Sequence, residues 1–147
     1  MIRRTKGRMA FCVALLIATL VFIRGNSLLP ASVSSAFSSW VKSLLGIVSQ
    51  GVVKPGTGFL RKLAHFQEFA FLGANLFWLF AMVLRMQRSV VAAGFGCSVF
   101  TACVDEWLQS FSSGRNPSLI DVSIDSAGAA VGLGLLLIGY IILRNKN

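Results

Sequence analysis

Long apolar runs alternate with short polar segments along this chain, and this pattern predicts its structure. A helix needs about 20 apolar residues to cross a hydrocarbon core of about 30 Å, and four runs reach or approach that length. The pattern therefore predicts an all-α membrane protein whose four transmembrane helices form a single domain. The spans are expected at about residues 9–23, 63–84, 90–111 and 120–143.

The first run is the shortest, because Arg8 and Arg24 bracket only fifteen residues. A basic segment before a short apolar run is also typical of a cleaved signal peptide. No convincing cleavage site of small residues follows the run, and the long side chain of Arg24 can reach the interface from within a helix. We therefore expect a retained first helix that ends near Ile23.

The segment between the first two spans has a periodicity of its own. Apolar residues recur every three or four positions from Val33 to Val48, and serines occupy the other face. This spacing predicts an amphipathic helix at about residues 32–49, with Pro30 and Ser32 near its start. The simplest interpretation is a helix lying in the outer interface of the membrane. A lid over the outer ends of the spans is the functional alternative.

Composition supports a membrane protein and excludes other classes. Of the 147 residues, 55% are hydrophobic and 13% are charged, whereas a typical soluble domain has about 25% charged residues. The net charge of +9 comes from short basic clusters at the ends of the apolar runs, as in residues that flank membrane helices. No basic stripe carries interleaved aromatic residues, so we expect no nucleic-acid partner.

The basic residues also predict an orientation. Eight Lys and Arg residues lie in the N-terminal segment, the turn between the second and third spans, and the C-terminal segment. With four spans, these three segments share one side of the membrane. Because Lys and Arg are concentrated in short cytoplasmic loops, we expect both termini to face the cytoplasm in a bacterial inner membrane.

Polar residues gather where three spans approach the outer side. The chain has only five acidic residues and one histidine, and an ionisable residue within a span is a candidate functional residue. At a rise of about 1.5 Å per residue, Glu68 and Asp105 lie within roughly 10 Å of the expected outer boundary. The residues of this predicted polar layer are Lys62, His65, Glu68, Asp105, Glu106, Gln109, Asp121, Asp125 and, in the turn before the last span, Arg115.

Three chemical uses follow from these residue types. Carboxylates in a low-dielectric site suit general acid and base catalysis, and Arg115 can hold a phosphate or carboxylate through two hydrogen bonds. His, Glu and Asp also bind divalent cations, but no HExxH-type spacing is present, so we expect no metal site and no cofactor. The structural alternative is that Arg61, Lys62 and Arg115 neutralise the acids and join the helices. In an enzyme, the catalytic residues would be Glu68, Asp105, Glu106 and His65.

Two glycines on the last span predict close helix packing. Gly128 and Gly132 are four residues apart and continue the stripe of Asp121 and Asp125. Small residues at this spacing let membrane helices approach closely. We expect the third and fourth spans to meet along this stripe, which would bring their acids together.

Two motifs within residues 60–133 resemble the signatures of the VanZ-like family. The segment KLAHFQEFAFLG at residues 62–73 is similar to the first signature. The segment DEWLQSF at residues 105–111, with Gly114-Arg115, Asp121 and Gly128 after it, is similar to the second. The chain departs from the family at Phe69, where Tyr is frequent, and at Asp125, where Asn is frequent.

The resemblance implies a small bacterial inner-membrane protein of the cell envelope. Some relatives confer low-level resistance to teicoplanin-type glycopeptides, and others are associated with envelope or exopolysaccharide functions. We therefore keep two functions open. The first is a non-catalytic protein that binds a lipid-linked envelope precursor or a lipoglycopeptide at the outer leaflet, among membrane lipids. The second is a membrane-embedded acid/base enzyme acting on an envelope lipid.

A transporter is a weaker third interpretation. Four spans make a small bundle, so a conduction path would need several copies of the chain. The oligomeric state is left open.

Overall fold

Four long helices make up most of the computed structural model, which describes residues 6–30, 32–33, 36, 57–84, 87–113 and 116–146. They are α1 (Lys6–Leu28), α3 (Thr57–Val83), α4 (Gln87–Gln109) and α5 (Leu119–Asn145). All four are long and apolar enough to cross a membrane, which confirms the predicted fold class. The amphipathic helix predicted at about residues 32–49 lies almost wholly outside the described residues.

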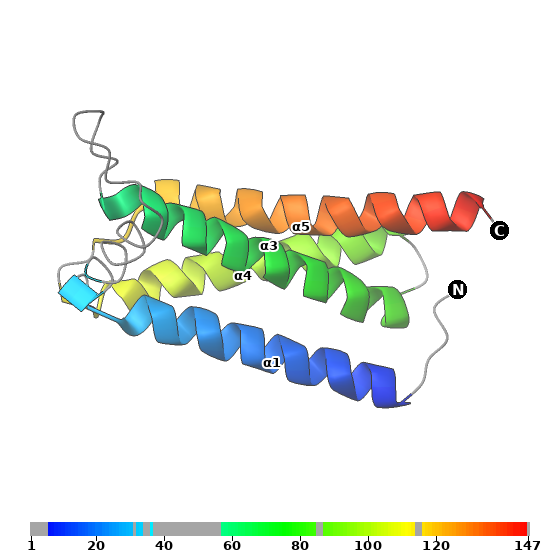
Figure 1. Cartoon of the computed structure of the whole chain (residues 1–147), viewed down its shortest axis with the longest axis horizontal. Coiled ribbons are helices and arrows are strands. Elements are labelled where there is room, and N and C mark those ends of the chain that lie inside the picture. The colour runs from blue at the N-terminus through cyan, green and yellow to red at the C-terminus, as the bar shows by residue number, and fades with distance from the viewer. Residues whose placement is uncertain are drawn as a thin grey trace.

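The four helices lie side by side along their length, and each runs antiparallel to the one before it (Figure 1). The start of α1, the turn between α3 and α4, and the end of α5 meet at one end of the bundle. The end of α1, the start of α3 and the turn between α4 and α5 meet at the other end. Arg8, Arg88 and Arg144 therefore lie near the same end.

The surface of the bundle is apolar, as contact with lipid requires. Large hydrophobic side chains such as Phe11, Phe100 and Leu135 are exposed. The hydroxyls of Thr19 and Ser98 donate hydrogen bonds to carbonyl oxygens four residues earlier, at 2.7 and 2.8 Å. These local bonds satisfy polar groups that would otherwise be costly to bury in hydrocarbon.

The closest helix contact joins α3 and α5, which also make the most extensive contact in the bundle. A Cβ atom at Gly128 would collide with the backbone carbonyl of Phe66, and one at Gly132 would collide with that of Ala70. A Cβ atom at Gly73 of α3 would likewise collide with the backbone carbonyl of Ala129 in α5. These glycines therefore allow the two backbones to touch.

The prediction that the third span packs against this stripe of the fourth span was wrong. Gly128 and Gly132 pack against the second span rather than the third, because the backbone of α3 at Phe66 and Ala70 lies directly against them. The contact between α4 and α5 is looser, and Gly94 meets the side chain of Leu133 there. The acids of α4 and α5 come together because both helices also pack on α3.

The first helix extends beyond its expected end. Instead of stopping near Ile23, α1 continues to Leu28 and includes Arg24. The charge of Arg24 does not end the helix within the bundle, because it is paired with Asp105 of α4. A hydropathy pattern treats any arginine as a boundary and cannot detect such a partner.

Candidate functional site

Polar side chains from all four helices converge at the end of the bundle opposite the start of α1 and the end of α5. Helical spacing of three or four residues puts them on the inward faces of their helices. Arg115 lies outside the described residues. The other predicted layer residues are brought together there and, with Arg61, form what we call the polar cluster: Arg61, Lys62, His65, Glu68, Asp105, Glu106, Gln109, Asp121 and Asp125.

Asp105 is the most fully paired acid of the cluster. Its side chain is completely buried, and its Oδ1 accepts a hydrogen bond from Arg24 Nη1 at 2.8 Å in an ion pair. Its Oδ2 accepts hydrogen bonds from Ser27 Oγ at 2.6 Å and Gln109 Nε2 at 2.9 Å. Arg24 also donates to the carbonyl of Thr101. Asp105 therefore fastens α1 to α4.

Three residues of α1 that the sequence did not predict belong to this region. Arg24 and Ser27 hold Asp105, and the side-chain amide of Asn26 donates a hydrogen bond to Glu68 Oε1. Their one signal in the sequence is that they lie at the same expected depth as the polar layer. Because the first span was expected to end near Ile23, the prediction placed these three residues outside the helix.

Glu68 and His65 form the link between α1 and the interior of the cluster. His65 Nδ1 lies 3.9 Å from Glu68 Oε2, one helical turn along α3. His65 is buried, with 7% of its surface exposed. Glu68 thus contacts α1 on one side through Asn26 and faces the histidine on the other.

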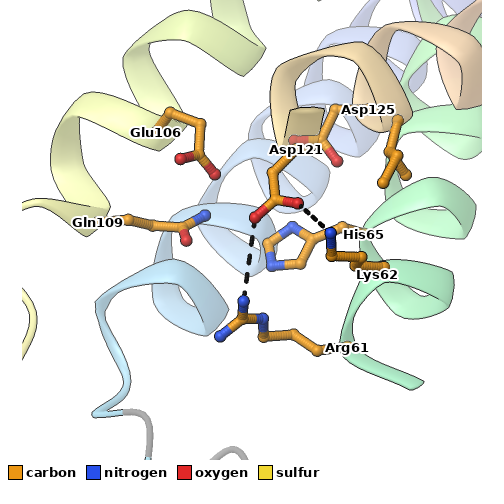
Figure 2. Close-up of a pocket in the computed structure, with 8 residues that line it drawn as sticks. Arg61, Lys62, His65, Glu106, Gln109, Asp121 and Asp125 are labelled. Carbon is orange, nitrogen blue, oxygen red and sulfur yellow. Dashed lines mark ion pairs between the residues drawn. The ribbon is translucent and has the colours of Figure 1, made fainter. Parts of the chain in front are cut away.

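Asp121 forms ion pairs with two cations of α3. Its carboxylate lies 3.0 Å from Lys62 Nζ and 3.9 Å from Arg61 Nη2 (Figure 2). All three side chains are partly exposed, so the pair is more open to water than the one at Asp105. As an acid in the first turn of α5, Asp121 also lies near the positive end of the helix dipole.

A small polar pocket opens between α3, α4 and α5, and Figure 2 shows its lining side chains pointing toward one another. Its closed interior is small, about 10 Å³, which is room for about one water molecule. A larger head group would therefore have to bind at the open side of the pocket or displace the side chains that line it. The lining comprises Arg61, Lys62, His65, Glu106, Gln109, Asp121, Ile124 and Asp125.

Two acids of this pocket have oxygens with neither a hydrogen bond nor an ion pair among the described residues. Glu106 Oε2 accepts a hydrogen bond from the backbone N–H of Ser118 at 2.7 Å, but its Oε1 has no hydrogen-bond partner among the described residues. Asp125 is 1% exposed, and neither of its oxygens has such a partner within the described part of the chain. Buried polar atoms are nearly always satisfied, so these oxygens are available to a ligand.

His65, Asp105 and Asp125 bring one potential ligand atom each into a common space. These three atoms lie within 4.8 Å of one another, and all three residues are buried. They come from α3, α4 and α5, so no spacing along the chain could reveal the group.

The arrangement has the means for two kinds of chemistry. Arg61 and Lys62 can bind an anion at the pocket, and unsatisfied carboxylate oxygens beside His65 can exchange a proton or bind a cation. Among the described residues, five carboxylates face three Lys and Arg side chains. The cluster is therefore richer in acids than ion pairing alone requires.

Comparison with known proteins gives one match. A family model described as VanZ/LLP1 matches residues 9–143, which is nearly the whole chain and includes every described residue of the polar cluster. The comparison with curated proteins found no match, and neither did the comparison with solved structures.

Proposed function

The chain belongs to the VanZ/LLP1 family, and from this premise we propose that it binds an anionic lipid-linked or lipidated envelope ligand at the outer leaflet of the bacterial inner membrane. The observation that carries the proposal is the polar pocket with Arg61 and Lys62 in its wall. Both cations lie near a single acid, Asp121. A phosphate can replace that carboxylate with stronger, charge-assisted hydrogen bonds.

The proposed orientation rests on the basic residues. Short segments rich in Lys and Arg face the cytoplasm, and Arg8, Arg88 and Arg144 lie near the end of the bundle opposite the polar cluster. Both chain termini are then cytoplasmic, and the pocket opens toward the outer leaflet. Lipid-linked envelope precursors and glycopeptides are encountered on that side.

An apolar groove between α1 and α3 supports a ligand with a lipid chain. It is lined on α1 by residues such as Leu15 and Phe22 and on α3 by Phe71 and Glu68. Glu68 connects the groove to the pocket, because its carboxylate lies 3.9 Å from the Nδ1 of His65 in the pocket wall. In our proposal the chain lies along the groove and the head group reaches the pocket.

Binding of a polyprenyl phosphate to the purified protein tests the proposal. The double variant Arg61→Gln/Lys62→Gln removes two charge-assisted contacts and should weaken binding at least about tenfold, measured by native mass spectrometry or a fluorescent analogue in detergent. The matched control is Lys6→Gln/Arg8→Gln, which removes two exposed cations at the opposite end of the bundle. Equal losses in both double variants, or none in either, would contradict the pocket as the site.

Teicoplanin susceptibility tests the lipidated-ligand part of the proposal. A sensitive host that expresses the wild-type chain should tolerate more teicoplanin, and the protection should fall in Arg61→Gln/Lys62→Gln and in Glu68→Gln at matched membrane levels. A well-expressed wild-type chain that gives no protection would remove this part and leave binding of envelope lipids as the function.

The acid/base enzyme is a second candidate, favoured by the unsatisfied Oε1 of Glu106 in the pocket wall. Glu106→Gln keeps the shape of the side chain and its bond from Ser118 but cannot transfer a proton. An envelope phenotype that is lost in Glu106→Gln while polyprenyl phosphate binding is retained would favour the enzyme. A phenotype that survives in Glu68→Gln, Asp105→Asn and Glu106→Gln would exclude it.

A further inference from the structure

We propose that His65, Asp105 and Asp125 form a binding site for a divalent transition-metal ion, with Zn²⁺ as the assigned ion, on the inner side of the polar pocket. This inference goes beyond the proposed function and does not rest on it. It also departs from the expectation of no metal site, which was based on spacing along single helices.

The geometry of the three side chains supports the site. One nitrogen and two carboxylate oxygens lie within 4.8 Å of one another. Ligand atoms in a tetrahedral zinc site are about 3.3 Å apart, because each bond is about 2.0–2.2 Å long. Rotations of His65 and Asp125 would have to close this difference, because hydrogen bonds hold the carboxylate of Asp105. His65 and Asp125 also line the pocket, which gives an ion access from the end of the bundle.

Asp125 supplies an independent argument. It is 1% exposed, and neither oxygen has a hydrogen-bond partner among the described residues. An ionised carboxylate buried in this way is very costly unless it is paired or coordinates a metal. The nearby cations among the described residues are engaged elsewhere, since Arg24 pairs with Asp105, and Lys62 and Arg61 lie at Asp121. A divalent ion would provide the charge that Asp125 lacks.

The chemistry of the ligand set favours zinc over magnesium or calcium. Imidazole suits Zn²⁺ and other late transition metals, whereas Mg²⁺ and Ca²⁺ prefer oxygen ligands alone. Asp105 has the support that metal-binding carboxylates usually have, because Ser27 and Gln109 donate hydrogen bonds to it and hold its orientation. An ionised carboxylate has about four lone-pair sites, so its three hydrogen bonds leave one for the ion.

Zinc binding to the purified full chain in detergent tests the inference. The exposed Cys97 and Cys103 are first changed to Ser in every variant, because thiolates also bind zinc. The protein is stripped with EDTA, titrated with Zn²⁺ alone, and assayed for bound metal after gel filtration. We expect about one zinc ion per chain and a rise in Tm with zinc, since an ion that binds only the folded state stabilises it.

Two variants and a matched control identify the ligands. Asp125→Asn and His65→Gln should each weaken zinc binding at least about tenfold, because each removes a metal ligand. Asp121→Asn removes a neighbouring acid that is ion-paired and not in the ligand group, so its binding should equal that of the parent.

Each outcome decides for or against the site. A parent chain that binds no stoichiometric zinc and shows no rise in Tm overturns the inference. Undiminished binding in Asp125→Asn, or an equal loss in Asp121→Asn, overturns the assignment of ligands. Should Asp125→Asn fail to fold, His65→Gln and the zinc-dependent Tm of the parent still decide the question.

Discussion

Two of the helices that pack on α3, α5 and α1, are attached to it by different physical means. Along α5, glycines let the two backbones touch, and no side chain separates them at Gly128 and Gly132. The contact with α1 instead includes a polar link at one end, where Asn26 bonds to Glu68, and an open apolar groove beyond it. The contact with α5 brings the two backbones together, whereas the contact with α1 is made by side chains, which include Ile23 of α1 and Leu72 of α3 in a shared apolar core.

This difference shows two physical means by which the helices of one membrane bundle associate. Lipid gives little hydrophobic drive for helix association, so helices associate through close packing or through hydrogen bonds. The packed α3–α5 pair provides the frame. Arg24 and Ser27 attach α1 to α4 through a single acid, Asp105, and an apolar groove lies between α1 and α3.

The largest effect is expected from overpacking the frame. Gly132→Leu places a side chain against the backbone of Ala70, and neither backbone can yield without separating the helices. We expect the free energy of unfolding to fall by about 3 kcal/mol or more, or folded protein to be lost. Unfolding in SDS followed by circular dichroism measures this change.

The matched control is Gly134→Leu on the same helix, where a Cβ meets no described atom within 4 Å. Its effect should stay within about 0.5 kcal/mol. If both glycine variants were equally stable, close backbone contact could not be what holds α3 to α5.

A smaller effect is expected from breaking the polar attachment of α1. Arg24→Met keeps a long side chain but leaves Asp105 buried without its cation. We expect a loss of about 2 kcal/mol, below the ~3–5 kcal/mol for fully buried pairs, because Arg24 is partly exposed. The same SDS titration measures it, with Arg88→Met at the exposed start of α4 as control. A stable Arg24→Met protein would mean that α1 is held by the groove residues instead.

The smallest effect on stability is expected at Asp125. Both Asp105 and Asp125 are almost fully buried, so the same substitution can be compared at the two positions. Asp105→Asn breaks an ion pair and should cost about 2 kcal/mol. Asp125→Asn breaks no hydrogen bond among the described residues and removes a buried carboxylate that has no cation, so in metal-free buffer it should not lower the free energy of unfolding. Equal costs at the two positions would show that Asp125 has a structural partner.

Much of the fold and part of the site could be predicted from the chain. Four apolar runs predicted four spans, and the cluster of acids, His65 and Lys62 was expected at the ends of three of them. The prediction missed Arg24, Asn26 and Ser27, because an arginine was taken as the end of a span. It also assigned the wrong partner to Gly128 and Gly132, since a stripe of small residues does not specify which helix it meets.

The order of amino acids sets the properties that depend on one helix at a time. Apolar length sets which segments span the membrane, and the periodicity of about 3.6 residues sets which side chains share a face and at what depth. The rotation and neighbours of each helix depend on packing across the whole bundle. Packing across the bundle therefore pairs Asp105 with Arg24, leaves Asp125 without a hydrogen bond among the described residues, and brings both acids beside His65.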